Sequence, residues 1–360
     1  MSARPRRVFL VGLYGVDNVG DDAIRLAVER AAPALGAEVR RYAVRHSSRD
    51  PRAVRLRSDP RGYLAAIRGA DTVALGGGGL LKDEGHALLR GYGILLELLA
   101  TALVARALRR RVALLAIGAG PIHTRRGRLL VRAIAQLAHV RQVRDEDSAQ
   151  TLRALRVRGV EVTTDPTFSM FDDIEKPGGT DAHAVVSVRP WFMFEADRET
   201  REAALQTAFA RAADALATAG SAPRFASLYW PRDREASEAT IARMGSAQAA
   251  SALDGPLDWD ALAAQLRGAR LLVAMRYHAI ACAAMAGCAI VPVAYEPKVA
   301  SLAQALGLPC LDVEDADLAE RLPALTAAAL ADPDAHRPPR ERLGALAEDA
   351  RAGLRRAIGA

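Results

Sequence analysis

Short apolar runs alternate with longer amphipathic stretches along most of the chain. The short runs predict buried strands and the longer stretches predict helices, because strands need about five residues and helices about ten or more. In the first half, strands are expected at residues 8–13, 38–44, 71–75, 112–117, 141–143 and 161–164. Helices are expected between them, at residues 21–35, 85–108, 125–138 and 148–155, with a polar connection at 45–61.

A second series of the same kind follows a polar stretch at 172–181 that contains Pro177 and two glycines. It predicts strands at 184–188, 224–228, 271–274 and 289–294, and helices at 198–219, 259–267, 279–286 and 340–358. Repeated alternation of strand and helix is typical of a doubly wound parallel sheet. We therefore expect an α/β protein with two Rossmann-like domains facing a cleft. The expected domains are residues 1–171 and 183–337, with a linker at 172–182 and a C-terminal helix within 338–360 that packs back on the first domain.

The strands at 271–274 and 289–294 enclose a helix of small residues, which Gly287 is placed to end. Arg276 and His278 follow the first of these strands, and Lys298 follows the second. Neighbouring strands of an open parallel sheet release their loops at one edge, where ligands bind. We therefore expect two cations and an imidazole to share a site. A lone histidine is more often structural, but beside an arginine His278 is suited to proton transfer near neutral pH.

Two glycine-rich loops follow strands of the first half. One contains Gly15, Asn18, Gly20 and Asp21, residue types that permit positive φ or cap a helix. It lacks the spacing of a dinucleotide-binding loop, so we predict no nicotinamide cofactor. The other loop consists of Gly76, Gly77, Gly78 and Gly79. Its backbone N–H groups are able to cradle an oxyanion, although a tight turn between strand and helix is the simpler interpretation.

Arg144 and Asp145 follow the short strand at 141–143. They are either a surface ion pair or the start of a binding site in which Arg144 clamps a carboxylate or phosphate with its planar fork. Lys298 is one of only three lysines in the chain, against 46 arginines. An ammonium and a guanidinium are not interchangeable at a tight phosphate site, so this choice of residue favours a specific role.

Composition limits the alternatives further. With 360 residues, 51% of them hydrophobic and 25% charged, the chain is expected to be globular. Its three cysteines, Cys282, Cys288 and Cys310, show no ligand spacing and are expected to be buried thiols in a cytoplasmic protein. We predict no membrane-spanning helix, because the best candidate, residues 94–108, is interrupted by Glu97 and Arg106.

Charge is distributed unevenly. Residues 1–170 contain 29 Lys and Arg against 16 Asp and Glu, whereas residues 171–360 contain 20 against 26. Two interpretations stay open: a solvated surface rich in arginine, which we favour, or a first half that faces an anionic substrate or an acidic membrane surface. Nucleic acid is a less suitable partner, because aromatic residues are only 5% of the chain and do not interleave with the arginines.

Taken together and in order, these motifs resemble those of the polysaccharide pyruvyltransferase family, from Gly12 to Lys298. The shared patterns are Gly-x-x-Gly-x-x-Asn-x-Gly-Asp, Gly-Gly-Gly-x-Leu-Leu-x-Asp, Gly-x-Gly-Pro, Arg-Asp-x-x-Ser, Asp-Pro, Ser-x-Arg, Arg-x-His and Tyr-x-x-Lys. The family is similar in fold to the two-domain glycosyltransferases called GT-B. Residues 45–61 and 228–246 fit none of its patterns, which leaves the acceptor undefined.

The resemblance implies transfer of the pyruvyl group of phosphoenolpyruvate onto two hydroxyls of a glycan sugar, with release of phosphate. Arg144, His278 and Lys298 match residues on which the family's donor site and catalysis depend. We expect Arg276 to contact substrate as well, together with the loop residues Gly15, Asn18, Gly20, Asp21, Gly77, Gly78 and Gly79. The first domain is expected to bind the acceptor and the second the donor.

We expect no metal or cofactor beyond phosphoenolpyruvate, because the cationic side chains suffice for its two anionic groups. The acceptor is expected to be a glycan, with or without a lipid-linked diphosphate, in a cytoplasmic protein. Contact of the basic first half with the inner face of the membrane stays open as the less favoured interpretation of its charge. Two other classes of function stay open. One is a GT-B glycosyltransferase that uses a nucleotide sugar, and the other is a glycan- or phosphate-binding protein without turnover.

Overall fold

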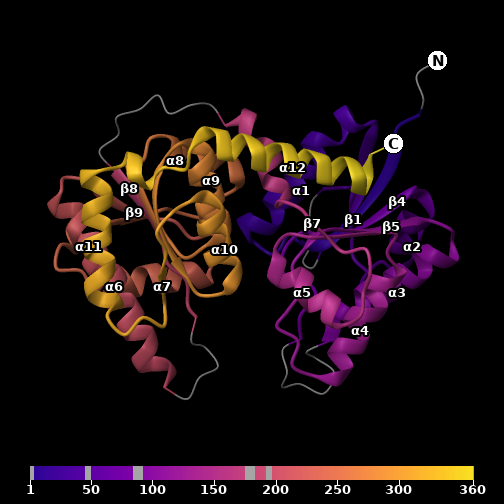
Figure 1. Ribbon diagram of the computed structural model, residues 1–360, viewed down its shortest axis with the longest axis horizontal. Coiled ribbons are helices and arrows are strands. Elements are labelled where there is room, and N and C mark those ends of the chain that lie inside the picture. Colours follow the sequence, from indigo (N-terminus) through magenta and orange to yellow (C-terminus); the bar gives the residue numbers. More distant parts are fainter. Residues whose placement is uncertain (1–3, 45–49, 84–91, 175–182, 192–196, 360) are drawn as a thin grey trace. The chain divides into compact units, whose positions relative to one another are not determined.

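The computed structural model describes residues 4–44, 50–83, 92–174, 183–191 and 197–359. The chain divides into two compact units (Figure 1). The first consists of Met1–Val16, Asp21–Met170 and Ala345–Ala360, and the second of Asp17–Gly20 and Phe171–Gly344. The expected first domain thus lacks the short loop Asp17–Gly20, which belongs to the second unit. Of the expected linker, residues 172–174 are described, and 175–182 lie outside the described residues.

The first unit is built on a parallel sheet whose strands have the order β3-β2-β1-β4-β5-β6-β7. The strands are β1 (Arg6–Tyr14), β2 (Ala37–Val44), β3 (Ala53–Val54), β4 (Thr72–Gly76), β5 (Arg111–Ile117), β6 (Val140–Val143) and β7 (Glu161–Val162). Apolar side chains occupy both faces of β1, an inner strand of this sheet. Phe9 and Val11 belong to one core cluster, and Val8 and Leu10 belong to the other. Such a strand requires helices on both sides of the sheet.

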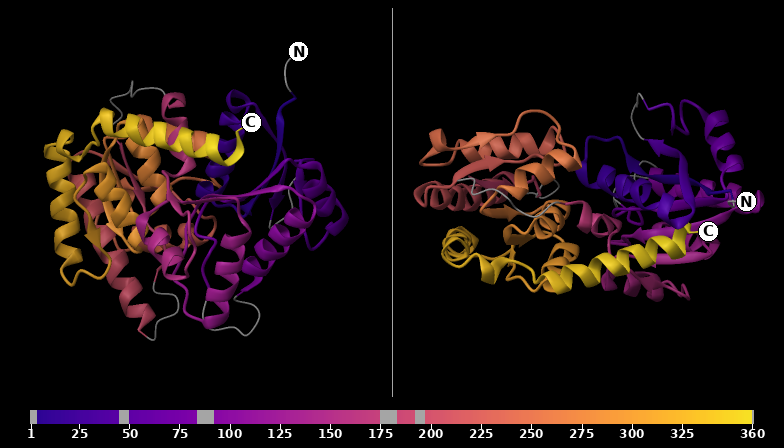
Figure 2. Two further views of the ribbon diagram at one scale, coloured as in Figure 1. Left: turned by 45° about the vertical axis from the view of Figure 1, so that its right-hand side comes forward. Right: turned by 90° about the horizontal axis from the view of Figure 1, so that it is seen from above.

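Helices cover both faces of this sheet (Figure 1). One face carries α2 (Pro60–Gly69), α3 (Gly93–Ala107), α4 (Arg125–Leu137) and α5 (Glu146–Ala154). The other carries α1 (Val19–Ala31) and the end of α12 (Arg340–Ile358), where Leu354 and Ile358 pack against β1 and β2 (Figure 2). The Gln142 amide donates to the carbonyl of Gly353 at 3.1 Å, which fixes α12 to β6.

The second unit repeats this plan with a sheet in the order β10-β9-β8-β11-β12-β13, whose paired strands are all parallel. Its strands are β8 (His183–Ser187), β9 (Ala222–Phe225), β10 (Ser251–Ala252), β11 (Leu271–Ala274), β12 (Ala289–Ala294) and β13 (Leu311–Asp312). Its helices are α6 (Arg198–Thr218), α7 (Arg232–Ile241), α8 (Trp259–Arg267), α9 (Tyr277–Ala286), α10 (Pro297–Leu306) and α11 (Leu318–Ala331).

Several predicted elements need correction. The helix expected at 21–35 ends at Ala31, because Pro33 cannot continue it and starts a 3₁₀ turn, Pro33–Leu35. The helix expected at 85–108 begins at Gly93, with residues 85–91 outside the described part. The structure also contains seven strands and helices that we did not predict: β3, β10, β13, α2, α7, α10 and α11. None of the described helices has the length and apolar character that crossing a bilayer requires.

Two of the three cysteines are buried, as predicted, and Cys310 is partly exposed. Burial raises the pKa of the Cys288 thiol to about 12 and that of Cys310 to about 11, and it also raises the pKa of Cys282. A thiol is nucleophilic only as the thiolate, so these cysteines pack in the second unit without offering a reactive group.

Candidate functional site

In each sheet, most of the predicted residues follow a strand at which the strand order reverses, whereas Arg144 follows β6 and Lys298 follows β12. The neighbours at these points are β1 and β4 in the first sheet, and β8 and β11 in the second. Open α/β sheets bind ligands beyond the carboxyl ends of strands at this topological switch point. β11 also pairs with β12, so Arg276, His278 and Lys298 follow neighbouring strands as predicted.

The imidazole of His278 lies against the backbone of Gly20 within the second unit. His278 is the second residue of α9, and its side chain is partly exposed. A β-carbon added to Gly20 would overlap Nδ1 of the ring and lie only 2.8 Å from Cε1. Asn18 accepts a hydrogen bond from the Gly20 N–H at 3.1 Å through its side-chain oxygen. Asn18 and Gly20, predicted from the first glycine loop, therefore lie together with the histidine.

Backbone hydrogen bonds hold the Asp17–Gly20 loop in the second unit. Val19 donates to the carbonyl of Leu228 at 2.8 Å, and Trp230 donates to the carbonyl of Asp17 at 3.0 Å. An antiparallel bridge between Asn18 and Tyr229 lies between these two bonds. The segment after β9, which matched no pattern in the sequence, thus positions the loop beside His278.

Arg276 forms an ion pair with Asp233, a residue of α7 that we did not predict as part of the site. Its Nε donates to Oδ2 at 2.8 Å, and its Nη2 donates to Oδ1. The carboxylate is fully buried, and Oδ2 also accepts from the N–H groups of Leu228 and Tyr229 at 3.1 and 3.0 Å. Asp233 therefore joins the predicted arginine to the segment that holds the Asp17–Gly20 loop. Arg276 thus has a positioning role, and its contact with substrate stays a prediction.

Lys298 lies in the first turn of α10, where it forms an ion pair with Glu296. Its Nζ is 5.0 Å from the ring centre of Tyr295, and the guanidinium of Arg189 is 4.4 Å from the same ring. Burial by itself would raise the pKa of the Tyr295 phenol, but the charges of Lys298, Arg189 and Arg276 outweigh it and lower this pKa. The shift indicates a positive potential at the carboxyl ends of β8, β11 and β12.

Aromatic side chains complete this part of the site. The rings of Trp191 and Tyr295 meet edge to face with centres 4.9 Å apart, and Arg189 is 5.5 Å from the Trp191 ring. Arg189 had no specific role assigned from the sequence. Its position directly after a strand next to β11 was a usable signal, because it places the arginine at the same edge of the sheet as His278.

In the first unit, the second glycine loop is packed so tightly that side chains do not fit. Gly76, Gly77 and Gly78 have φ of 145°, 81° and 77°, values that favour glycine. A β-carbon at Gly78 would lie 2.6 Å from Oδ1 of Asp21, and one at Gly77 would overlap Ile24. The loop thus lies against the first turns of α1, and the predicted residues Asp21, Gly77 and Gly78 come together.

Arg144 lies against two glycine turns of the same unit. Its side chain is only 5% exposed. Its Nη2 is 3.9 Å from a β-carbon built on Gly79 and 3.0 Å from one built on Gly118. Asp145 is 3.4 Å from Nε of Arg144 and also caps α5 by accepting from the Ser148 N–H at 2.7 Å. The surface ion pair considered from the sequence is excluded by this burial. Arg144 lies beside Gly79 in the first unit, and its predicted role as a clamp at the donor site stays a prediction.

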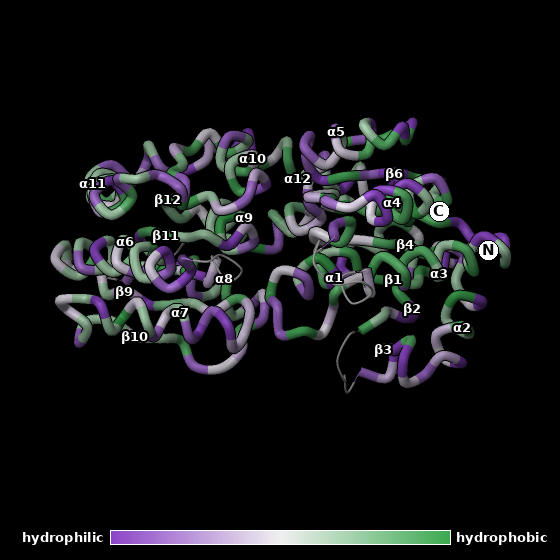
Figure 3. Tube along the Cα trace, turned by 90° about the horizontal axis from the view of Figure 1, so that it is seen from below, coloured by the Kyte–Doolittle hydropathy of each residue, from purple (hydrophilic) through white to green (hydrophobic). Residues whose placement is uncertain are grey.

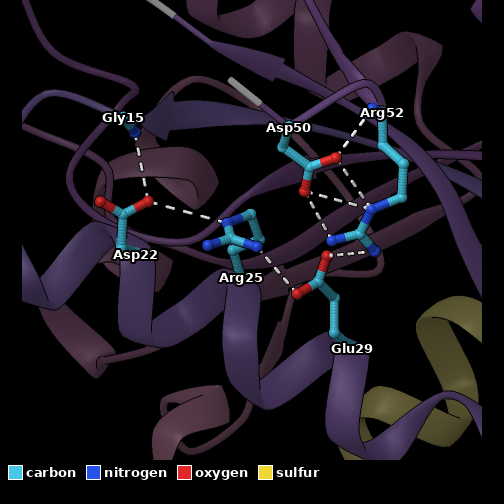
Figure 4. Close-up of polar contacts among 6 residues, drawn as sticks. All are labelled: Gly15, Asp22, Arg25, Glu29, Asp50 and Arg52. Atoms are coloured by element: carbon cyan, nitrogen blue, oxygen red, sulfur yellow. Dashed lines mark hydrogen bonds and ion pairs between the residues drawn. The ribbon is translucent and has the colours of Figure 1, made fainter. Parts of the chain in front are cut away.

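Gly15, the remaining predicted residue, is hydrogen-bonded to one end of a chain of ion pairs in which acidic and basic side chains alternate. The Gly15 N–H donates to Asp22 at 3.2 Å, and Asp22 lies 3.7 Å from Arg25. This chain of contacts runs through Gly15, Asp22, Arg25, Glu29, Arg52 and Asp50 (Figure 4). It ties the loop after β1 to α1 and to the chain before β3.

The predicted residues thus form two groups. Asn18, Gly20, Arg276, His278 and Lys298 belong to the second unit. Gly15, Asp21, Gly77, Gly78, Gly79 and Arg144 belong to the first. The cations and the imidazole of the second unit suit the binding of an anionic substrate and proton transfer. Within the described ranges, no three His, Cys, Asp or Glu residues are arranged to hold a metal ion.

Solved structures with the same fold cover nearly the whole chain. HepE of Anabaena in complex with UDP-glucose is 10% identical with a TM-score of 0.58, and 98% of this chain and 96% of HepE are covered. A putative UDP-N-acetylglucosamine 2-epimerase from Listeria monocytogenes is 12% identical with a TM-score of 0.60, covering 99% and 92%. Sucrose-phosphate synthase from Thermosynechococcus elongatus is 15% identical with a TM-score of 0.54, covering 98% and 95%.

These similarities confirm the predicted fold class, an α/β protein with two Rossmann-like parallel sheets of the GT-B type. No curated protein matches the chain at a significant level. The family model described as polysaccharide pyruvyl transferase matches residues 18–297, which include Asn18, Gly20, Arg144, Arg276 and His278 and end directly before Lys298. This match covers most of the chain and follows the motifs that the sequence analysis identified, so the protein belongs to the polysaccharide pyruvyl transferase family.

Proposed function

We propose that the protein transfers the pyruvyl group of phosphoenolpyruvate to two hydroxyls of one sugar in a glycan, forming a cyclic ketal. Membership of the family supplies the reaction class. The observation that carries the proposal is the positive potential around Tyr295, to which Lys298, Arg189 and Arg276 contribute at the strand ends next to His278. Phosphoenolpyruvate has a carboxylate and a phosphate, and both are stabilised by fixed cations in a partly buried site.

The chemistry requires two additions to one carbon. Protonation of the enol methylene makes the methyl group and activates C2, which the first sugar hydroxyl attacks. Loss of phosphate then activates C2 again, and the second hydroxyl closes the ketal ring. The two hydroxyl protons balance the reaction, since one replaces the proton given to the methylene and the other leaves with phosphate. The protein therefore has to move protons at the substrate and stabilise a leaving phosphate.

We assign the proton transfers to His278, because an imidazole both gives and takes a proton near neutral pH. Within the second unit, Lys298 and Arg189 bind the anionic groups of phosphoenolpyruvate. Arg144 of the first unit is proposed as a clamp for a carboxylate or phosphate. Asp233 holds Arg276 and, through the segment 228–230, the backbone around Gly20. In this proposal no metal and no cofactor take part beyond phosphoenolpyruvate itself.

The acceptor is proposed to be a glycan bound mainly by the first unit, whose loop at Gly76–Gly78 has close-packed backbone with little room for side chains. The excess of arginine in residues 1–170 favours an acceptor with an anionic group, such as a lipid-linked diphosphate. This assignment places the reaction in the assembly of a cell-surface polysaccharide.

The test is to incubate the purified full-length protein with phosphoenolpyruvate and a panel of nitrophenyl glycosides that carry free neighbouring hydroxyls. We expect phosphate release that depends on the glycoside, together with a product whose mass increases by one pyruvyl ketal. A chelator should leave the rate unchanged. Release of a nucleoside diphosphate from a nucleotide sugar, without ketal formation from phosphoenolpyruvate, would replace this proposal with a glycosyltransferase.

A further inference from the structure

Two neighbouring helices of the first unit expose large apolar side chains. On α3, Leu96 and Leu103 are 44% and 51% exposed, and on α4 Leu129 is 67% exposed. The phenol of Tyr92, at the start of α3, donates to the hydroxyl of Thr124, the N-cap of α4, at 2.8 Å. The three leucines therefore lie on adjoining helices that cover the same face of the sheet (Figure 1).

The exposed side of α3 is apolar although its opposite side is already buried. Leu95 and Leu98 belong to the core of the unit. Leu96, Ala100, Leu103 and Ala107 are exposed at intervals of three and four residues and so form one stripe along the helix. A helix on the surface of a sheet normally presents polar residues to solvent, whereas α3 is apolar around most of its circumference (Figure 3). An apolar stripe of this kind indicates an interaction surface.

Arginines accompany these leucines almost without carboxylates. Residues 93–141 contain nine arginines and a single acidic residue, Glu97. Arg125, Arg126 and Arg128 are exposed in the first turns of α4, next to Leu129, and none of them forms an ion pair with another described residue. At the other end of the helices, burial and the charges of nearby arginines, led by Arg106, lower the pKa of His139. The buried carboxylate of Asp83 accepts from Thr124 at the start of α4, so the surface carries an excess of positive charge that this acid offsets only in part.

We propose that this α3–α4 surface, formed by Leu96, Leu103, Leu129, Arg125, Arg126 and Arg128, docks onto a membrane that contains anionic phospholipids. Leucines on such a surface enter the boundary between headgroups and acyl chains, and neighbouring arginines pair with lipid phosphates. Both kinds of residue are needed for this partner. The proposed docking does not depend on the pyruvyl transfer reaction, because the residues proposed for that reaction lie on other elements of the fold.

A nucleic acid is the other anionic partner with a comparable charge. It would use the arginines but give no reason for three exposed leucines, because single strands are bound through stacking on aromatic rings. This surface combines arginines with leucines, whereas a surface that binds single strands combines arginines with aromatic residues. The combination therefore favours a lipid surface. The two partners are also distinguished by experiment, since only the lipid should require the leucines.

The test is co-sedimentation of the full-length protein with vesicles of phosphatidylcholine alone or of phosphatidylcholine with phosphatidylglycerol. We expect binding only to the anionic vesicles, weakening as salt is raised. Arg125→Glu combined with Arg128→Glu should lower the partition coefficient about twentyfold or more, since each arginine near an anionic surface contributes about fivefold. Leu96→Gln combined with Leu103→Gln should lower it about tenfold at unchanged net charge.

A matched control reverses the same number of charges elsewhere. Arg211→Glu combined with Arg243→Glu alters exposed arginines of α6 and of the chain after α7, and should leave vesicle binding within about twofold of the parent. Thermal melting of each variant checks that the fold is kept, since all substituted side chains are exposed. The proposal is overturned if the leucine variant binds anionic vesicles as well as the parent. It is also overturned if the parent ignores such vesicles but retains a single-stranded oligonucleotide.

Discussion

The imidazole of His278 occupies the space that a side chain on Gly20 would need. A β-carbon there would overlap Nδ1 and approach Cε1 to 2.8 Å, although the two residues are more than 250 positions apart in the chain. The glycine of the Asn-x-Gly motif therefore allows the histidine to adopt its position. The motif's Asn18 supports this arrangement by accepting the Gly20 N–H.

Gly20→Ala should consequently impair catalysis more than folding. The added methyl group displaces the ring, and a displacement of about 1 Å in a catalytic group can cost about 10²-fold in rate. We expect kcat for phosphate release to fall by about that factor, with a small change in melting temperature because the ring can rotate away. Gly69→Ala is the control, since a β-carbon there meets nothing within 4 Å. Normal turnover by Gly20→Ala would show that the position of the ring is not critical.

Asp233→Ala should destabilise the second unit strongly. It removes a fully buried carboxylate that accepts from Arg276 and from two backbone N–H groups, leaving a charge and two donors without their partner. Breaking a buried pair from one side costs about 3–5 kcal/mol. Urea unfolding measures this cost.

The control for Asp233 is Glu238→Ala on the same helix. Glu238 pairs with Arg234 on the surface, where the two side chains are 53% and 41% exposed. Such a pair contributes less than about 1 kcal/mol. Similar losses of stability in the two variants would contradict the structural role of Asp233.

The sequence predicted the unit around His278 well, because its signals are local. The apolar runs at Leu271–Ala274 and Ala289–Ala294 became β11 and β12 with unchanged bounds. Gly287 ends α9 in the left-handed region, with φ of 73°, as a C-terminal glycine should. The strand order that brings Arg276 and Lys298 to one edge follows from the general behaviour of parallel sheets.

Of the elements that the sequence did not reveal, α2 and α7 were missed for different reasons. The start of α2 was recognisable, since Asp59 caps the helix by accepting from the Gly62 N–H and Pro60 takes the first position. The helix α7 has few apolar residues, so its periodicity gave no signal, and Asp233 within it looked like a surface charge. The pairing of Asp17–Gly20 with residues 228–230 joins distant segments, and no local pattern reports such a contact.

Acid should remove a contribution to stability that comes from Asp50. Hydrogen bonds from the Arg52 side chain, which outweigh partial burial, lower the pKa of Asp50 from 3.8 to about 2 (Figure 4). Because the pKa is lowered in the folded state, the contribution is complete above about pH 4 and is lost as the pH falls towards 2. Arg52 is 43% exposed, so screening by solvent reduces the contribution to about 1 kcal/mol.

Asp50→Asn should therefore reduce the free energy of unfolding by about 1 kcal/mol at pH 7 and by much less at pH 2. Urea titrations at the two pH values measure the difference. Asp334→Asn is the control, because Asp334 is 88% exposed in its pair with Arg337 and should contribute little at either pH. An equal loss at both pH values would mean that the carboxylate charge of Asp50 is not what stabilises the fold.

His278→Ala and Lys298→Ala should fail in different ways if the proposed reaction is correct. Loss of the imidazole removes proton transfer in the transition state, so kcat should fall about 10²–10⁴-fold with little change in the KM for phosphoenolpyruvate. Lys298 provides a charge already needed in the ground state, so its loss should mainly raise that KM. Lys298→Arg should restore binding only in part, because the planar guanidinium places its charge differently beside Tyr295 and Glu296.

Steady-state phosphate release by the folded variants separates these effects. Arg211→Ala, on the exposed side of α6, is the control and should leave both constants unchanged. A normal kcat in His278→Ala would remove the histidine from the mechanism. An unchanged KM in Lys298→Ala would place the donor away from the carboxyl end of β12, although Lys298 and Arg189 both lie over the Tyr295 ring and lower its pKa. The kinetics thus test whether this positive potential serves phosphoenolpyruvate.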